Sequence, residues 1–178
     1  FVCNFCKPEV ITEKFEIAPN LRQVLVILNS VGISNLPNKI PITLVNSRDE
    51  LMRLSKNRLG NIQGYTEYEE ESTLFGEIAS QSYHIYILSN LHKVVFNAVL
   101  AHELLHVYLF QHHLDLRSDV REGFCNLGSN IVYEYYLNND PRKMPSETLI
   151  SQRAGNQYEN LKIELNKMHD SELSRYRI

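Results

Sequence analysis

The sequence predicts one α+β domain, in which a small mixed sheet packs on a long buried helix with further helices around it. Three observations support this. Apolar residues between positions 19 and 31 recur with helical spacing. Two short runs, Ile40–Val45 and Tyr83–Leu88, are rich in the β-branched and aromatic residues typical of strands. The run Val94–Phe110 is apolar almost all round, as expected of a helix inside a core.

The composition is that of an ordinary globular protein, with 43% hydrophobic and 22% charged residues in 178. This length suits one domain, which we place at residues 11–178. A net charge of −3 provides no basic surface for nucleic acid. We expect no membrane-spanning run and no signal peptide, and hence a cytoplasmic protein. The chain begins at Phe1 rather than Met, as a fragment or a processed form would.

Helix 19–31 is expected to end at Gly32. After the strand Ile40–Val45, Ser47 and Glu50 have the spacing of a capping box, which predicts a second helix from about residue 48 to 58.

The acidic and aromatic segment Tyr65–Glu71 is expected to be a solvated loop or an edge strand, or alternatively a surface for a basic substrate or partner. A short strand is expected at residues 73–78, followed by the strand Tyr83–Leu88. Ser89 or Asn90 is then expected to cap the long helix.

The long apolar helix contains the polar residues His102, Glu103 and His106. Histidines four positions apart lie on one face of a helix, with Cβ atoms about 5–6 Å apart, so both imidazoles can bind one Zn²⁺. Glu103 is offset from that face and can serve a metal-bound water as general base, as in the H-E-x-x-H motif of zinc peptidases. The alternative is a helix whose histidines are satisfied by hydrogen bonds within the core.

Glu122 is the candidate for the third zinc ligand, because a catalytic zinc needs three protein ligands and one open position. It lies near the start of a helix predicted at about residues 120–137, and Gly123 would let that helix pack closely. Asn126, one turn later, can bond a ligand histidine and fix its tautomer. Alternatively, Glu122 is a first-turn glutamate favoured by the helix dipole.

Cysteines are sparse. Cys3 and Cys6 form a C-x-x-C pair, and three interpretations stay open for them. The pair is half of a structural zinc knuckle remaining at residues 1–10, a redox pair, or two thiols at a frayed terminus. Cys125 lies in an apolar helical context and is expected to be part of the core.

The segments 101–106 and 119–126, with Arg153–Asn156, resemble the C-terminal peptidase domain of plant LIM-domain, ubiquitin-activated peptidases and its bacterial relatives. The resemblance covers most of the chain and is strongest between His102 and Asn126. It implies a zincin-like, gluzincin-type metalloendopeptidase fold that holds zinc. Arg121 replaces an acidic residue of the plant proteins, and Asn126 replaces a glutamine. Ubiquitin-type regulation rests on the resemblance alone, since no ubiquitin-interacting module is visible.

The same resemblance implies that His102, His106 and Glu122 are zinc ligands and that Glu103 is the catalytic base. We therefore expect peptide-bond hydrolysis by a zinc-activated water, with a protein or peptide as substrate. Two alternatives stay open: an interaction module held by structural zinc, and an inactive peptidase fold that acts as a binding scaffold.

Two further expectations concern the substrate. The strand Tyr83–Leu88 is expected to pair with an extended peptide by strand addition. An oxyanion donor is also needed, and Tyr133, Tyr136 and His112 are the candidates.

Overall fold

A computed structural model describes residues 9–37, 39–56, 62–72 and 78–139. Cys3 and Cys6, most of the segment 1–10, most of the strand expected at residues 73–78, and Arg153–Asn156 lie outside these ranges. The described residues form a mixed α+β fold with two small sheets and four α-helices. In chain order the elements are β1 (Val10–Ile11), η2 (Lys14–Glu16), α1 (Ile17–Ser30), β2 (Ile42–Val45), α2 (Arg48–Leu54), β3 (Gly64–Ser72), β4 (Ile78–Leu88), β5 (Leu91–His92), α3 (Lys93–Gln111) and α4 (Ser118–Asn139).

The larger sheet is mixed, as the sequence predicts, with the strand order β2-β4-β3. Strand β2 is parallel to β4, whereas β3 is antiparallel to it. Tyr65–Glu71 therefore forms most of an edge strand, one of the two structures expected for it. Tyr83–Leu88 lies within the central strand β4. Its residues Ile85–Leu88 pair with β2 on one side and with β3 on the other, so the expectation that a substrate pairs there is wrong for these four positions.

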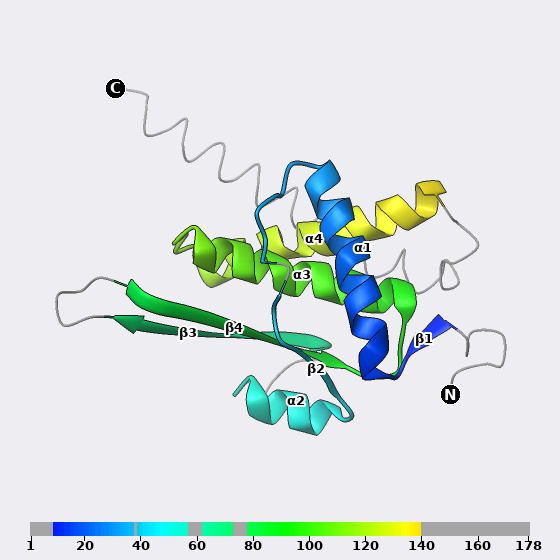
Figure 1. Cartoon of the computed structure of the whole chain (residues 1–178), viewed down its shortest axis with the longest axis horizontal. Helices are drawn as coiled ribbons and strands as arrows, with labels where there is room; N and C mark the ends of the chain where they lie inside the picture. Colours follow the sequence, from blue (N-terminus) through cyan, green and yellow to red (C-terminus); the bar gives the residue numbers. More distant parts are fainter. Residues whose placement is uncertain (1–8, 38, 57–61, 73–77, 140–178) are drawn as a thin grey trace.

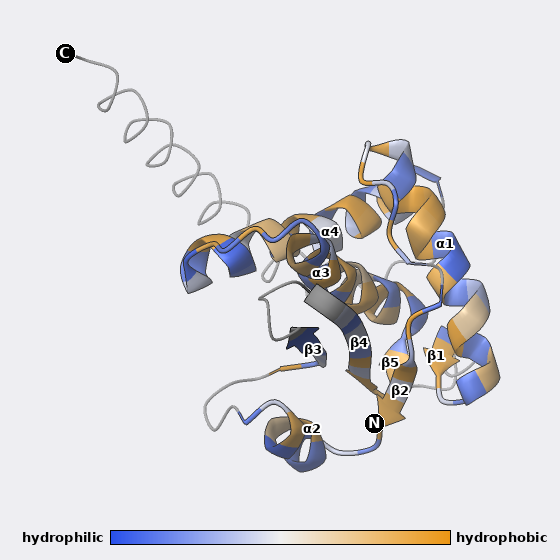
Figure 2. Cartoon of the chain, turned by 60° about the vertical axis from the view of Figure 1, so that its left-hand side comes forward, coloured by the Kyte–Doolittle hydropathy of each residue, from blue (hydrophilic) through white to orange (hydrophobic). Residues whose placement is uncertain are grey.

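The sheet separates a large core from a small one (Figure 1). On one face, Ile85 and Ile87 pack in a common core with residues of α1, α3 and α4. On the other face, Leu88 packs with Val45 and with Leu51 of the short helix α2. Figure 2 shows the apolar side of α1 directed towards α3 and β4. Alternate residues of β4 thus serve two cores, as the two-residue period of a strand requires.

The first turn of α3 is capped by His92 and not by Ser89 or Asn90, so the predicted cap is wrong. The Val94 amide donates to His92 Nδ1 at 3.3 Å. Asn90 instead has a positive φ of 61° in a turn, and its amide donates to the Ile11 carbonyl at 2.8 Å. The short strand β5 follows this turn, pairs with β1 and leads directly into α3.

Most other helix boundaries agree closely with the sequence. Ser47 accepts from the Glu50 amide at 3.2 Å and caps α2. The helix ends at Leu54 and is followed by a turn at Ser55 and Lys56, so it is shorter than the predicted helix to residue 58. Gly32 follows α1 with a φ of 91°, a left-handed conformation that favours glycine. Helix α3 ends at Gln111, as expected.

Helix α3 is long and apolar enough to span a membrane by length and composition alone, which differs from the expectation of no such run. Its side chains are packed in the protein core, and residues such as Phe96, Leu100 and Leu104 are fully buried. This burial is what a core helix of a soluble protein shows.

Helix α4 packs closely on α3 at Gly128. A Cβ at Gly128 would lie 2.8 Å from the backbone oxygen of Ala101. The absence of a side chain therefore sets how near the two helices approach. Ser129 adds a hydrogen bond at the same crossing, since its hydroxyl donates to the Ala98 carbonyl at 2.8 Å.

Candidate metal centre

The middle of α3 presents two imidazoles side by side. Their Nε2 atoms are 3.2 Å apart, and the side chains of His102 and His106 are 18% and 14% exposed. The four-residue spacing places both rings on the helix face that meets α4, as predicted. The rings are nearly perpendicular to each other, with an interplanar angle of 70°.

Helix α4 brings Glu122 to the same place. One carboxylate oxygen lies 3.4 Å from His102 Nε2, and the other lies 3.5 Å from His106 Nε2. Glu122 lies in the first turns of α4, two helical turns before the close crossing at Gly128. Asn126 follows one turn later, and its side chain is among the neighbours that raise the pKa of His102, as expected of a residue near that ring.

These three distances fit a tetrahedral ion. Zinc bonds of about 2.0–2.1 Å in tetrahedral geometry place neighbouring ligand atoms about 3.3 Å apart. The separations of 3.2, 3.4 and 3.5 Å lie close to that value. Two imidazole nitrogens and one carboxylate also form a donor set typical of catalytic zinc. Glu122 is half-exposed, so the site opens to solvent on its side.

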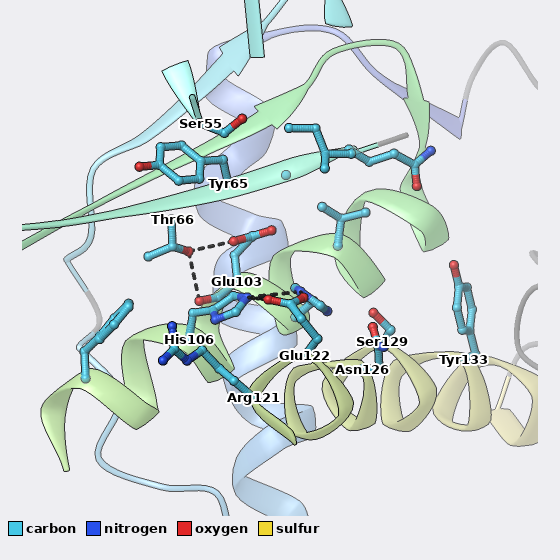
Figure 3. A pocket seen from close by; sticks show the side chains of 16 residues that line it. Ser55, Tyr65, Thr66, Glu103, His106, Arg121, Glu122, Asn126, Ser129 and Tyr133 are labelled. Atoms are coloured by element: carbon cyan, nitrogen blue, oxygen red, sulfur yellow. Dashed lines mark hydrogen bonds and ion pairs between the residues drawn. The ribbon is translucent and has the colours of Figure 1, made fainter. Parts of the chain in front are cut away.

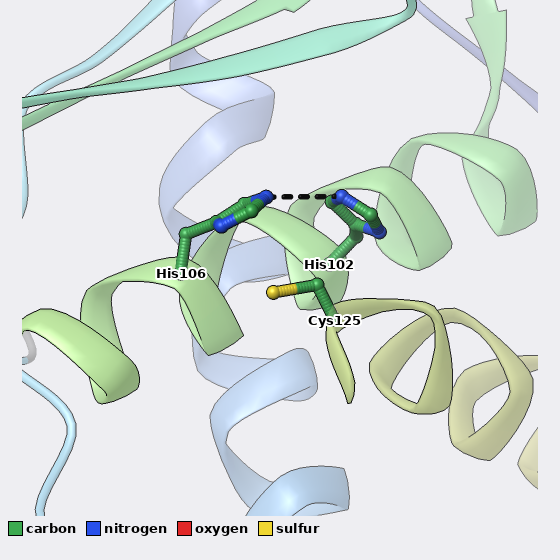
Figure 4. A group of neighbouring side chains, drawn as sticks. All are labelled: His102, His106 and Cys125. Atoms are coloured by element: carbon green, nitrogen blue, oxygen red, sulfur yellow. Dashed lines mark hydrogen bonds between the residues drawn. The ribbon is translucent and has the colours of Figure 1, made fainter. Parts of the chain in front are cut away.

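Cys125 also lies within reach of this site. Its sulfur and one ring nitrogen of each histidine lie within 4.8 Å of one another, and Figure 4 shows the thiol directed from α4 towards α3. The residue is fully buried in a small core with Leu105 and Leu109, as predicted for a core residue. Burial raises the pKa of the thiol, and the nearby carboxylates of Glu122 and Glu103 raise it further.

The charges of the site are strongly interdependent. Burial and the neighbouring His102 lower the pKa of His106, which keeps it neutral at neutral pH. For His102, burial lowers the pKa, but the hydrogen bond to Glu122 and the charges of Glu103 and Glu122 outweigh it, and the pKa is raised. The hydrogen bond from His102 lowers the pKa of Glu122 and keeps its carboxylate ionised.

Glu103 lies on a different face of α3 and points towards the sheet. It is 4% exposed, and its carboxylate accepts a hydrogen bond from the Thr66 hydroxyl at 2.7 Å (Figure 3). Burial raises the pKa of Glu103 to about 7, although the charge of His102 and the Thr66 hydroxyl oppose the rise. A carboxyl group of this pKa can both accept and release a proton near neutral pH.

Gly64, two residues before Thr66, lies against the same carboxylate. A Cβ at this position would be 2.5 Å from Glu103 Oε1 and 2.7 Å from Val99 Cγ1. Sequence reasoning missed both Gly64 and Thr66. The available signal was their alternation on one face of an edge strand, but nothing in the sequence pairs that face with α3.

All these groups except Cys125 line one cavity of about 550 Å³ between β3, α3 and α4. Arg121 and Tyr133 lie towards opposite ends of it (Figure 3). Of the three predicted oxyanion donors, only Tyr133 lines this cavity. Tyr136 is instead buried in the core, where its hydroxyl accepts from Asn97 Nδ2 at 2.9 Å. His112 is exposed after the end of α3, with its ring 4.3 Å from that of Tyr108.

Comparison with known proteins finds no matching family model, no matching curated protein and no matching solved structure.

Proposed function

We propose that this chain is a zinc-dependent metalloendopeptidase with a zincin-like fold. The observation that carries the proposal is the triangle formed by His102, His106 and Glu122, with the buried carboxylate of Glu103 beside it in the same cavity. Zinc would be held by these three side chains. When bound, it supplies a Lewis acid that polarises the scissile carbonyl and lowers the pKa of a coordinated water to about 7.

The remaining chemistry belongs to residues of this chain. Glu103 accepts a proton from the attacking water on its carboxylate and passes it to the nitrogen of the leaving amine. Asn126 lies beside His102 and would fix the orientation of that ring by accepting a hydrogen bond from it. Tyr133 is the remaining candidate for a donor to the developing oxyanion, because it lines the cavity.

We further propose that the peptide pairs with β3 instead of β4. The Leu88 amide donates to the Gln63 carbonyl at 2.9 Å, so Gln63 faces β4. Backbone groups alternate in direction along an antiparallel strand. Gly64 and Thr66 therefore direct their N–H and C=O groups to the other edge of β3, which pairs with no strand in the described part of the chain. An extended peptide can add there, beside the cavity.

The resemblance of residues 101–106 and 119–126 to the LIM-domain, ubiquitin-activated peptidases supports the same proposal. We include the cytoplasmic location and the protein or peptide substrate in it. Regulation by ubiquitin is not included, because the resemblance alone suggests it.

The test compares wild type with Glu103→Gln at equal zinc content, using a broad peptide library and detection of products by mass spectrometry. The variant keeps the shape of the side chain but lacks the base. It should retain zinc and lose about 10²–10⁴-fold in rate. Equal rates would refute the role of Glu103. Absence of cleavage by wild type would favour the inactive binding scaffold.

A second candidate function is an interaction module held by structural zinc, and the position of Cys125 favours it. A fourth protein ligand would close the site and leave no place for water. Cobalt substitution separates the candidates, because a thiolate ligand gives an intense near-ultraviolet charge-transfer band. The peptidase proposal predicts that wild type and Cys125→Ser have the same cobalt spectrum. A band that disappears in Cys125→Ser would identify the closed site.

A further inference from the structure

The edge strand β3 holds the carboxylate of Glu103 from two sides. Thr66 Oγ1 lies 2.7 Å from Oε2 of Glu103 and 3.2 Å from its backbone oxygen. Gly64, two residues earlier and on the same face of the strand, leaves the space that Oε1 occupies. Gly64 and Thr66 of β3 therefore each lie against one of the two carboxylate oxygens of Glu103.

The hydrogen bond from Thr66 reaches a carboxylate that is almost fully buried. Within the described ranges, the Thr66 hydroxyl is the one hydrogen-bond donor to the Glu103 carboxylate. A hydroxyl proton can be donated to one acceptor at a time, and the shorter distance together with the negative charge favours Oε2 over the backbone oxygen. Because Glu103 is nearly fully buried, losing this donor would leave its carboxylate without a described partner.

The same residue also lies on the free edge of the sheet. The side chain of Thr66 points to α3, whereas its N–H and C=O point to the edge proposed to receive the peptide. A peptide paired there would be bonded to the backbone of the residue whose hydroxyl holds the base. Thr66 alone would then determine the distance between the bound peptide and the carboxylate of Glu103.

We infer that Thr66 is a positioning residue, whose hydroxyl fixes the carboxylate of Glu103 relative to a peptide bound along β3. The inference rests on the proposed function for its kinetic consequence, but the contact itself does not. Thr66 acts through Glu103 and takes no part in the proton transfer itself. Its substitution should therefore lower kcat and leave zinc binding and KM nearly unchanged.

The test uses Thr66→Val, which keeps the branched shape and removes the hydroxyl, together with Thr66→Ser, which restores it. Thr43→Val is the matched control, because Thr43 lies on β2, its hydroxyl contacts His84, and neither residue lines the cavity. Misplacing a catalytic group by about 1 Å costs up to about 100-fold in rate. We expect a 10- to 100-fold lower kcat for Thr66→Val, a KM within twofold, and near wild-type values for Thr66→Ser and Thr43→Val.

Crystal structures of wild type and Thr66→Val provide a readout that does not depend on activity. In the variant, the Glu103 carboxylate should leave the position beside β3. An unchanged carboxylate, or a kcat for Thr66→Val equal to wild type, would overturn the inference. So would a loss that serine does not restore. If wild type cleaves no peptide, the proposed function fails, while the position of the carboxylate in the two structures still decides whether Thr66 holds it.

Discussion

Adding one methyl group at Gly128 should separate α4 from α3 and weaken zinc binding at the candidate metal centre. An alanine Cβ there would lie 2.8 Å from the Ala101 oxygen and 2.9 Å from its carbonyl carbon, and both are backbone atoms that cannot rotate away. Ordinary van der Waals contact begins at 3.4 Å, which exceeds the 2.8 Å at this position by about 0.6 Å. The two helices must therefore move apart by about 0.6 Å at the crossing.

The cost follows from two opposing effects. Overpacking of this kind costs about 1–3 kcal/mol, whereas alanine gains about 0.8–1.0 kcal/mol over glycine within a helix. At the middle of both ranges the net loss is about 1 kcal/mol, which corresponds to a fall in Tm of about 2–4 °C for a chain of this size. If Glu122 moves with α4, its distances of 3.4 and 3.5 Å to the histidines become about 4 Å, and zinc affinity should fall about tenfold.

Thermal unfolding and a competitive zinc titration measure both effects for Gly128→Ala. Glu134→Ala is the matched control, because it places the same residue on the exposed side of α4. The control should keep both its Tm and its zinc affinity. A Gly128→Ala protein that is as stable as wild type would refute the close crossing, and a lower Tm with unchanged zinc affinity would refute its link to Glu122.

Three further outcomes are expected. Glu122→Ala should lose most of its zinc, measured by elemental analysis, while its circular dichroism stays that of wild type; full zinc occupancy would remove Glu122 from the ligand set. A longer chain that includes upstream sequence should bind a second zinc through Cys3 and Cys6, and serine at both positions should abolish it; an unchanged metal count favours the frayed terminus. Tyr136→Phe should leave kcat unchanged but lower the free energy of unfolding by about 1–3 kcal/mol, because the buried Asn97 amide loses its acceptor; a loss of kcat at unchanged stability would return Tyr136 to the catalytic candidates.

Local signals predicted the elements that carry the site. The apolar run around His102, the helical spacing of α1 and the serine cap of α2 each depend on neighbouring residues only. The proximity of Glu122 to the histidines was also predicted, because Glu122 follows His106 by sixteen residues, enough for a short loop and a return helix.

What the sequence did not predict depends on distant parts of the chain. Strand β4 lies in the centre of the sheet and β3 at its edge, and the residue types of Tyr83–Leu88 do not predict this order. The contact of Thr66 with Glu103 spans 37 positions and requires the strand order and the helix rotation together. Tyr133 and Tyr136 are both tyrosines of α4, but Tyr136 lies on the face of the helix that packs into the core, whereas Tyr133 lines the cavity.

The pairing of β1 with β5 determines how force would reach the metal site. Only two residue pairs, Val10 with His92 and Ile11 with Leu91, join these strands, and His92 is also the cap of α3. Tension applied to the chain before Val10 is therefore transmitted through these two residue pairs to the first turn of α3, the helix that carries His102. Separation of these pairs would release from β1 the residue whose ring caps α3, so the strand β1 restrains the N-terminal end of the helix that carries the candidate zinc ligands, although it lies outside the cavity.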